Sequence, residues 1–155
     1  MEKKISGWGN NSFTNSKIYF PKNISEIKNL IKAKTIARGL GRSYGDSSIQ
    51  PKSTIITTKL NKVITFNSTK GFLEAEAGIS IEEILDLIVE KGWFLPVTPG
   101  SKRITLGGMV ASDVHGKNHH KDGSFKNHII NLKVVNEKKK LITCTEKSNK
   151  KLFKY

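Results

Sequence analysis

The sequence contains one cysteine, Cys144, and only 4 prolines and 2 tryptophans among its 155 residues. A single cysteine excludes a disulfide framework and a cysteine-cluster metal site. No apolar run approaches the roughly 20 residues that a membrane-spanning helix needs. Residues 1–8 lack the apolar stretch and cleavage site of a secretory signal. We therefore expect a protein of a reducing, cytoplasmic compartment.

Acidic residues are also scarce, 13 against 27 basic ones, which gives a net charge of +14. Only Arg38, Arg42 and Arg103 are arginines, although arginine is the residue that contacts phosphates and guanines in a bidentate manner. The lysines are scattered, and Asn and Ile are also frequent. This pattern favours a compositional bias and argues against specific nucleic-acid binding. A basic module that binds nucleic acid or an anionic membrane remains an alternative.

The length suits one domain, and the order of the expected elements indicates the α+β class. The polar residues 1–20 predict an irregular N-terminal arm. A helix capped by Asn23 should follow, and then short strands and a hairpin whose turn is residues 68–71. The expected strands cover residues 34–37, 54–58, 62–67 and 72–77.

The clearest helix begins at Ser80, which forms a capping box with Glu83, and it ends at Gly92. One or two helical turns should follow over residues 105–112, and then a polar loop over residues 115–124. Two strands, 128–136 and 140–145, should complete the chain without a terminal helix.

Two stretches carry features of a binding site. The first, residues 38–46, reads Arg-Gly-Leu-Gly-Arg-Ser-Tyr-Gly-Asp after an expected strand. Glycines allow positive φ angles and can turn consecutive N–H groups toward an oxyanion such as a pyrophosphate. The spacing fits neither the dinucleotide-binding G-x-G-x-x-G pattern nor a P-loop. A tight turn without a ligand is the alternative.

The second stretch, residues 99–120, combines glycines, small residues and histidines. Small side chains let a backbone approach a flat ligand closely, and Thr105 and Ser112 supply hydroxyl groups. His115 and His119 have the spacing of metal ligands on a helix, but Gly116 argues against a helix. We therefore expect a loop that lines a polar pocket, and no metal site.

Together the two stretches resemble a known family. Residues 37–46 resemble the first flavin-binding loop of the FAD-linked oxidases of the vanillyl-alcohol-oxidase type, and Pro99-Gly100 with residues 105–108 resembles their second loop. Within that superfamily, the run His-Gly-Lys-Asn-His-His at residues 115–120 resembles the flavoprotein subunits of decaprenylphosphoryl-β-D-ribose 2′-epimerases. Trp8-Gly9 also fits that subfamily. The resemblance extends over most of the chain.

The resemblance implies a PCMH-type FAD-binding domain over residues 21–155, with a first α/β lobe to about residue 75 and a second lobe, 76–155, that is incomplete at its C-terminus. FAD would be bound without a covalent bond, because Arg42 occupies the position of the histidine that carries the flavin in covalent relatives. The resemblance places His115, Lys117 and Tyr44 in the catalytic pocket. The residues that it assigns to the cofactor are Ala37, Arg38, Gly39, Leu40, Gly41, Arg42, Ser43, Tyr44, Gly45, Asp46, Ser47, Gly100, Thr105, Leu106, Gly107, Gly108, Ser112, Asp113, Val114 and His115.

The reaction that it implies is oxidation of a secondary alcohol, the 2′-hydroxyl of a polyprenylphosphoryl pentose, by hydride transfer to the flavin. A separate short-chain reductase would complete the epimerisation, in the synthesis of a cell-wall polysaccharide. A lipid-linked substrate would favour peripheral contact with the inner membrane. Another sugar or aldonolactone oxidase of the same superfamily is the nearest alternative. The electron acceptor, the catalytic base and the oligomeric state remain open.

Overall fold

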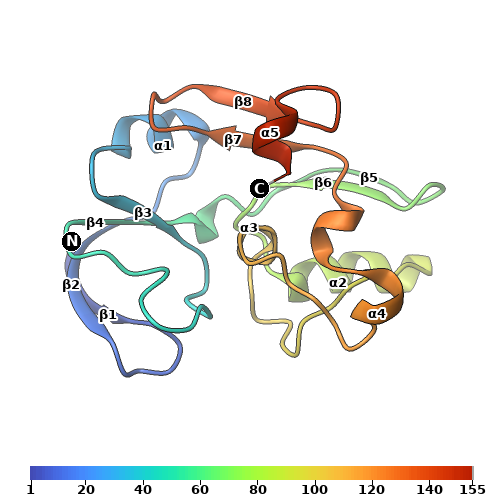
Figure 1. Cartoon of the computed structure of the whole chain (residues 1–155), viewed down its shortest axis with the longest axis horizontal. Coiled ribbons are helices and arrows are strands. Elements are labelled where there is room, and N and C mark those ends of the chain that lie inside the picture. Colours follow the sequence, from blue (N-terminus) through green and yellow to red (C-terminus); the bar gives the residue numbers. More distant parts are fainter. Residues whose placement is uncertain (155) are drawn as a thin grey trace.

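The computed structural model describes residues 1–154, so Tyr155, the last residue of the expected domain, lies outside the described residues. Figure 1 shows a sheet with α1 on one side of the molecule, α2 to α4 with a hairpin on the other, and a second hairpin with α5 across both. The mixture of helices and strands agrees with the α+β class predicted from the sequence.

The first sheet has four strands in the order β1-β2-β4-β3. β1 (Glu2–Ser6) and β2 (Phe13–Tyr19) form an antiparallel hairpin. β2 also pairs in parallel with β4 (Ser53–Ile56), and β4 pairs in parallel with β3 (Thr35–Arg38).

The prediction of an irregular arm over residues 1–20 is therefore wrong. Ser16 and Ile18 point into the structure and are buried, while their neighbours Asn15 and Lys17 are exposed. The hydroxyl of Ser16 is hydrogen-bonded to that of Thr54 on β4, at 2.8 Å. A buried serine looks like a surface residue in the sequence, because the strand that satisfies its hydroxyl lies 38 residues further along.

The remaining elements of this half match the predictions. α1 (Ile24–Leu30) begins at Asn23, whose side chain accepts a hydrogen bond from the backbone N–H of Glu26. β3 leads directly into residues 39–47, which we call the glycine-rich loop. Because β3 and β4 are parallel, this loop leaves the sheet at the same edge as the 3₁₀ turn Thr57–Lys59 that follows β4.

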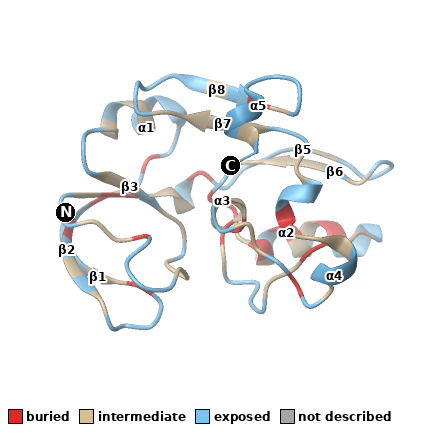
Figure 2. Ribbon diagram, in the orientation of Figure 1, coloured by how far each residue is buried: buried red, intermediate tan, exposed pale blue. Residues whose placement is uncertain are grey.

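The second half is built around α2 (Ile81–Ile88), whose capping box between Ser80 and Glu83 is confirmed. A 3₁₀ turn (Val89–Lys91) extends the helix to Gly92, which has a φ of 78°. Figure 2 shows that buried residues gather at α2 and the adjacent α3 (Leu106–Ala111). The buried core consists of Ile79, Ile81, Ile84, Ile88, Val97, Met109 and Phe125.

The predicted hairpin is also present, as β5 (Val63–Asn67) and β6 (Phe72–Ala75). Phe66 and Leu73 pack against the core of the second half. The division into two lobes near residue 75 stays a prediction. By these contacts, the β5-β6 hairpin, which precedes residue 75, packs with the second half of the chain.

Residues 115–154 contain more helix than the sequence predicts. α4 (His119–Asp122) forms within the expected polar loop, where the side chain of Asn118 donates to Asp122 Oδ2 at 2.7 Å. A 3₁₀ turn (Phe125–His128) delays the first strand, so that β7 covers Leu132–Val135 and pairs with β8 (Leu141–Cys144). α5 (Lys150–Phe153) lies where no terminal helix is expected. None of the helices within residues 1–154 is long and apolar enough to cross a membrane.

Candidate functional site

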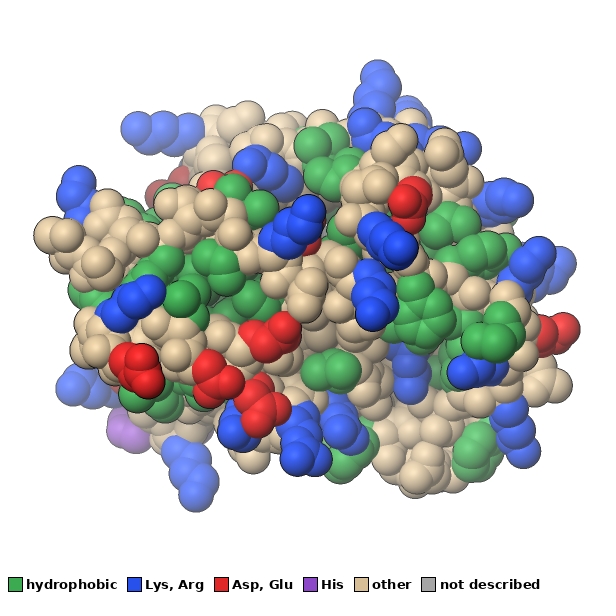
Figure 3. Space-filling model, turned by 180° about the vertical axis from the view of Figure 1, so that it is seen from behind, with side chains coloured by type: hydrophobic (Ala, Val, Ile, Leu, Met, Phe, Trp, Pro, Cys, Tyr) green, Lys and Arg blue, Asp and Glu red, His purple; other side chains and the backbone are tan. Residues whose placement is uncertain are grey.

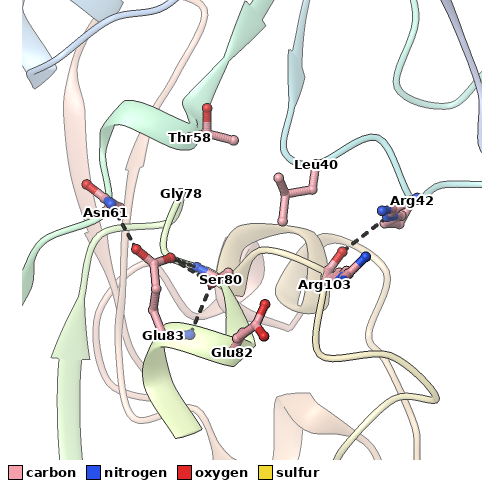
Figure 4. Close-up of a pocket in the computed structure, with 9 residues that line it drawn as sticks. All are labelled: Leu40, Arg42, Thr58, Asn61, Gly78, Ser80, Glu82, Glu83 and Arg103. Atoms are coloured by element: carbon pink, nitrogen blue, oxygen red, sulfur yellow. Dashed lines mark hydrogen bonds between the residues drawn. The ribbon is translucent and has the colours of Figure 1, made fainter. Parts of the chain in front are cut away.

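The two stretches that the sequence singles out meet in space. A Cβ atom on Gly39 would lie 2.2 Å from Thr105 Oγ1, so the glycine allows the backbone of one stretch to touch the side chain of the other. Arg42 Nε donates a hydrogen bond to the carbonyl oxygen of Arg103, 61 residues away, at 3.2 Å. Figure 4 shows this bond on one side of the space between the two stretches. The structure therefore joins the two segments into one candidate site.

The glycine-rich loop presents free backbone donors. Between Leu40 and Gly45, no backbone N–H donates a hydrogen bond to another group within the described residues 1–154. Gly41 and Gly45 have φ angles of 69° and 60°, in the left-handed region that favours glycine. A Cβ atom on Gly45 would meet nothing within 4 Å. A loop with unpaired N–H groups and an open side has the chemistry needed to bind a phosphate group.

A positive charge lies beneath this loop. The guanidinium of Arg38 is the group that a Cβ atom on Gly41 would strike, 2.2 Å from its Nη2 atom. Arg38 donates to the carbonyl oxygen of Ser6 at 2.8 Å, and to the hydroxyl of Ser48 at 3.2 Å. Partial burial lowers the pKa of Arg38, but an arginine remains protonated at neutral pH. None of the ion pairs of residues 1–154 involves Arg38, so no carboxylate neutralises its charge within these residues.

The second stretch offers close backbone approach and few free donors. Leu106 and Gly107 donate their N–H groups to the carbonyls of Ile79 and Ala77, at 2.8 and 2.7 Å. The N–H of Gly108 is hydrogen-bonded to Thr105 Oγ1 at 3.2 Å. The first donors of α3 are thus satisfied within the protein. In this geometry the glycine-rich loop has unpaired N–H groups, whereas the glycines of α3 mainly allow close packing.

A cavity of about 340 Å³ lies between the glycine-rich loop and the start of α2. Figure 4 shows Leu40 and Arg42 on one side, and Ser80, Glu82 and Glu83 on the other. Its mixture of hydroxyl, amide and charged groups suits a ligand that carries hydroxyl groups. Of its lining residues the sequence assigned only Leu40 and Arg42 to a site. The residues that it missed carry no binding motif or were read only as a strand end or a helix cap: Thr58, Asn61, Gly78, Ser80, Glu82, Glu83 and Arg103.

The carboxylates of the cavity are held by specific partners. Glu83 accepts hydrogen bonds from the hydroxyl and N–H of Ser80 and from Asn61, and the bonds from Ser80 are the main cause of its lowered pKa. Glu82 pairs with Lys102 at 2.7 Å, and the bond and charge of that lysine lower the pKa of Glu82. Both groups are therefore anionic at neutral pH, opposite Arg42 and Arg103.

The residues expected to be catalytic are exposed. Tyr44 is 79% exposed, and neither a hydrogen bond nor a ring contact joins it to His115 or Lys117 within residues 1–154. His115 forms an edge-on contact with the ring of His119, with 5.3 Å between centroids. These side chains are free to contact a ligand, and their roles stay predictions.

Residues 115–118 are held against the segment that immediately precedes the second stretch. Gly116 is buried, and a Cβ atom there would lie 3.0 Å from the carbonyl oxygen of Thr98. The side chain of Asn118 donates to the carbonyl oxygen of Pro96 at 2.9 Å. His115 and Lys117 therefore lie next to the segment that leads into Gly100.

Two other predicted cofactor residues hold the protein together in this structure. The carboxylate of Asp113 accepts a hydrogen bond from the N–H of Lys126 at 3.1 Å and pairs with its ammonium group at 3.2 Å. Burial raises the pKa of Asp113, but hydrogen bonds from Ser124 and Lys126 outweigh it and lower the pKa overall. Val114 packs against the core. Within residues 1–154, no three His, Cys, Asp or Glu side chains are arranged to hold a metal ion.

The family of this chain is shown by its similarity to known proteins. Residues 16–145 match the family described as the FAD binding domain. The chain is 32% identical over 144 residues to decaprenylphosphoryl-beta-D-ribose oxidase of Mycolicibacterium smegmatis, which covers 86% of this chain and 31% of that protein. It is 26% identical over 148 residues to D-arabinono-1,4-lactone oxidase of Kluyveromyces lactis, which covers 88% of this chain and 28% of the relative.

A solved structure shares the fold. The BBE-like 1 variant D396N of Physcomitrella patens superimposes with a TM-score of 0.76 at 18% sequence identity, over 92% of this chain and 32% of that one. The chain thus spans about a third or less of the length of the proteins that it matches.

Proposed function

Because the chain belongs to the FAD binding domain family, we propose that its glycine-rich loop holds the pyrophosphate of FAD, and that the complete protein oxidises a secondary alcohol of a sugar. The observation that carries the proposal is the run of unpaired N–H groups between Leu40 and Gly45, above the unpaired charge of Arg38. A diphosphate carries negative charge and several acceptor oxygens, which fit such donors.

We propose that the cofactor is held without a covalent bond. The only cysteine, Cys144, is buried in β8 and lies outside both stretches. The side chain at position 42 is an arginine, and its Nε atom donates a hydrogen bond to the carbonyl oxygen of Arg103. Neither residue offers a nucleophile to the flavin.

Oxidation of an alcohol needs a hydride acceptor that no side chain provides, and bound FAD supplies that chemistry. The chain's own residues would bind and orient the alcohol and help to move its proton. His115 and Lys117 are exposed beside Thr98, and Tyr44 is exposed on the glycine-rich loop, so all three can contact a substrate. An ammonium group such as that of Lys117 could also bind a substrate phosphate.

The substrate that we favour is a polyprenylphosphoryl pentose, oxidised at its 2′-hydroxyl. The resemblance to a decaprenylphosphoryl-ribose oxidase over 86% of the chain supports this assignment. An aldonolactone oxidase is the second candidate, because two yeast enzymes with that name match 88% of the chain. Turnover of a polyprenylphosphoryl pentose or of an aldonolactone by the protein at its native length would separate the two.

A lipid-linked substrate implies a partner enzyme and contact with a membrane. We propose a short-chain reductase that acts on the ketone product, and peripheral contact with the cytoplasmic face of the membrane. Figure 3 shows lysine and arginine side chains spread over the back of the molecule and no single basic patch there. A nucleic-acid-binding module would gather its positive charge on one face, and the face in Figure 3 shows no such patch.

The absorption spectrum of the purified chain tests the cofactor assignment. The chain is incubated with FAD and desalted, and its visible spectrum is compared with that of the untreated protein. We expect flavin bands that are retained on the column and released by denaturation. Failure to retain flavin, both in this chain and in the protein at its native length, would contradict the proposal.

A further inference from the structure

We propose that residues 6–10, the end of β1 and the turn that follows it, are a clamp that fixes the glycine-rich loop in its binding conformation before any cofactor arrives. The inference rests on the proposed function, because it assigns the loop to FAD. It goes beyond that function in assigning a positioning role to Trp8. The family match begins at residue 16, so the turn lies outside the matched range.

The turn touches the loop through its backbone. The N–H of Trp8 donates to the carbonyl oxygen of Ser43 at 3.0 Å. Gly7 is buried, and a Cβ atom on it would lie 1.9 Å from the carbonyl oxygen of Gly45. The turn thus bonds to the carbonyl of Ser43 and packs against that of Gly45, and within residues 1–154 the N–H groups from Leu40 to Gly45 remain unpaired. The clamp therefore contacts the carbonyl groups of the loop and leaves its N–H groups to the ligand.

Side chains complete the clamp. The guanidinium of Arg42 lies over the ring of Trp8, 4.1 Å from its centroid, while its Nε atom donates to Arg103. Below the loop, Arg38 reaches back to the carbonyl oxygen of Ser6 at 2.8 Å. Arg42 thus connects the loop, and Arg38 the end of β3 that leads into it, to residues 6–10. Among aromatic rings, the indole of tryptophan is the best partner for a cation–π interaction.

The arrangement has a clear energetic purpose. A loop with several unpaired N–H groups and two left-handed glycines loses conformational entropy when a ligand orders it. Contacts that order the loop in the free protein reduce this cost and so raise affinity. Trp8 is a positioning residue in this scheme: it acts through Arg42 and does not itself touch the cofactor.

The test compares Trp8→Ala with Phe13→Ala in the 155-residue chain. Phe13 is a matched control, because it lies in the same hairpin, is 54% exposed against 49% for Trp8, and carries its own cation, Lys4 Nζ, 4.8 Å from its ring. Two quantities are measured: the rate of tryptic cleavage after Arg42 without flavin, relative to cleavage after Lys139, and the Kd for FAD. A third variant, Trp8→Phe, keeps an aromatic ring under Arg42.

We expect Trp8→Ala to accelerate cleavage after Arg42 and to raise the Kd, each by about fivefold, the size of one cation–π contact. Phe13→Ala should change neither quantity, and Trp8→Phe should restore most of both. Unchanged cleavage and affinity in Trp8→Ala would overturn the clamp, as would equal effects of Trp8→Ala and Phe13→Ala. If neither the wild-type chain nor the protein at its native length takes up FAD, the proposed function fails, and the proteolysis, which needs no flavin, still decides whether the turn holds the loop.

Discussion

Gly39 and Thr105 lie so close that a methyl group on the glycine would fall 2.2 Å from the threonine hydroxyl oxygen. The same oxygen accepts the hydrogen bond from Gly108 that begins α3. A larger residue at position 39 would therefore have two effects: it would push the glycine-rich loop away from α3, and it would disturb the hydrogen bond that caps that helix.

Gly39→Ala should destabilise the chain by about 1–3 kcal/mol, the usual cost of overpacking a close contact, and should reduce FAD retention. Thermal unfolding and the flavin spectrum after desalting measure the two effects. Gly9→Ala is the control, because the nearest atom to its new methyl group would be a side-chain oxygen of Asn11 at 3.5 Å. Equal stability of the two variants would contradict the close approach.

Gly41→Ala should prevent flavin retention, whereas Gly92→Ala should not. Both glycines have positive φ angles, 69° and 78°, so each substitution carries a backbone strain of about 1–2 kcal/mol. A methyl group at residue 92 would meet nothing, but one at residue 41 would strike the guanidinium of Arg38. A Gly41→Ala variant that still binds FAD fully would show that the loop and Arg38 do not form the pyrophosphate site.

Acid should weaken the capping box of α2. Hydrogen bonds from Ser80 lower the pKa of Glu83 in the folded chain, so its stabilising effect is fully present above the ordinary pKa of a glutamate. That effect is lost as the pH falls through the lowered folded-state pKa. Glu83→Gln keeps a hydrogen-bonding side chain at this position and removes the titration. Urea unfolding at several pH values should therefore show a smaller loss of stability in acid for this variant than for the wild type.

The Glu90→Gln variant controls for the change in net charge, since Glu90 lies at the opposite end of the same helical segment. Its stability should fall with acid as steeply as that of the wild type. A wild-type slope for Glu83→Gln would mean that the box does not titrate.

Much of this fold could be predicted from the sequence wherever the determinants are local. Asn23 with Glu26, Ser80 with Glu83, and the terminating Gly92 each lie within a few residues of the group they satisfy. The hairpin β1-β2 could not be found, because the burial of Ser16 depends on Thr54 in another strand. α5 was missed for a similar reason, since the side chain of Asn149 before it is bonded to the carbonyl of Thr143.

The candidate site, too, could be predicted from the sequence only where its determinants are local. The glycines at 39, 41 and 45 indicate a loop of unusual conformation, and the structure gives two of them positive φ angles. Which N–H groups stay unpaired depends on tertiary contacts. Those of Leu106 and Gly107 in α3 are bonded to the carbonyls of Ile79 and Ala77, whereas those of residues 40–45 have no partner within residues 1–154. No motif in the sequence records that difference.

His115→Ala should leave thermal stability unchanged, because the residue is exposed and its contact with the ring of His119 is edge-on. In the protein at its native length, it should slow reduction of the flavin by substrate while most of the flavin is retained. Stopped-flow absorbance under anaerobic conditions measures that rate. Reduction at the wild-type rate would remove His115 from the active site.

Replacing Lys138, Lys139 and Lys140 by glutamine should not alter FAD binding. The three residues are exposed in and beside the turn between β7 and β8, and no ion pair within residues 1–154 uses them. A flavin titration of the triple variant checks this expectation. A marked rise in Kd would show that their charge has a specific role in the site.

The pairing of β2 with both β1 and β4 has a practical consequence for anyone who expresses part of this protein. A fragment cut to the matched range, residues 16–145, would begin inside β2 and lack β1 altogether. The remainder of β2 would become an exposed sheet edge whose free N–H and C=O groups can recruit other chains. Such a fragment should aggregate when it is produced in bacteria, even though it retains every glycine of the two stretches.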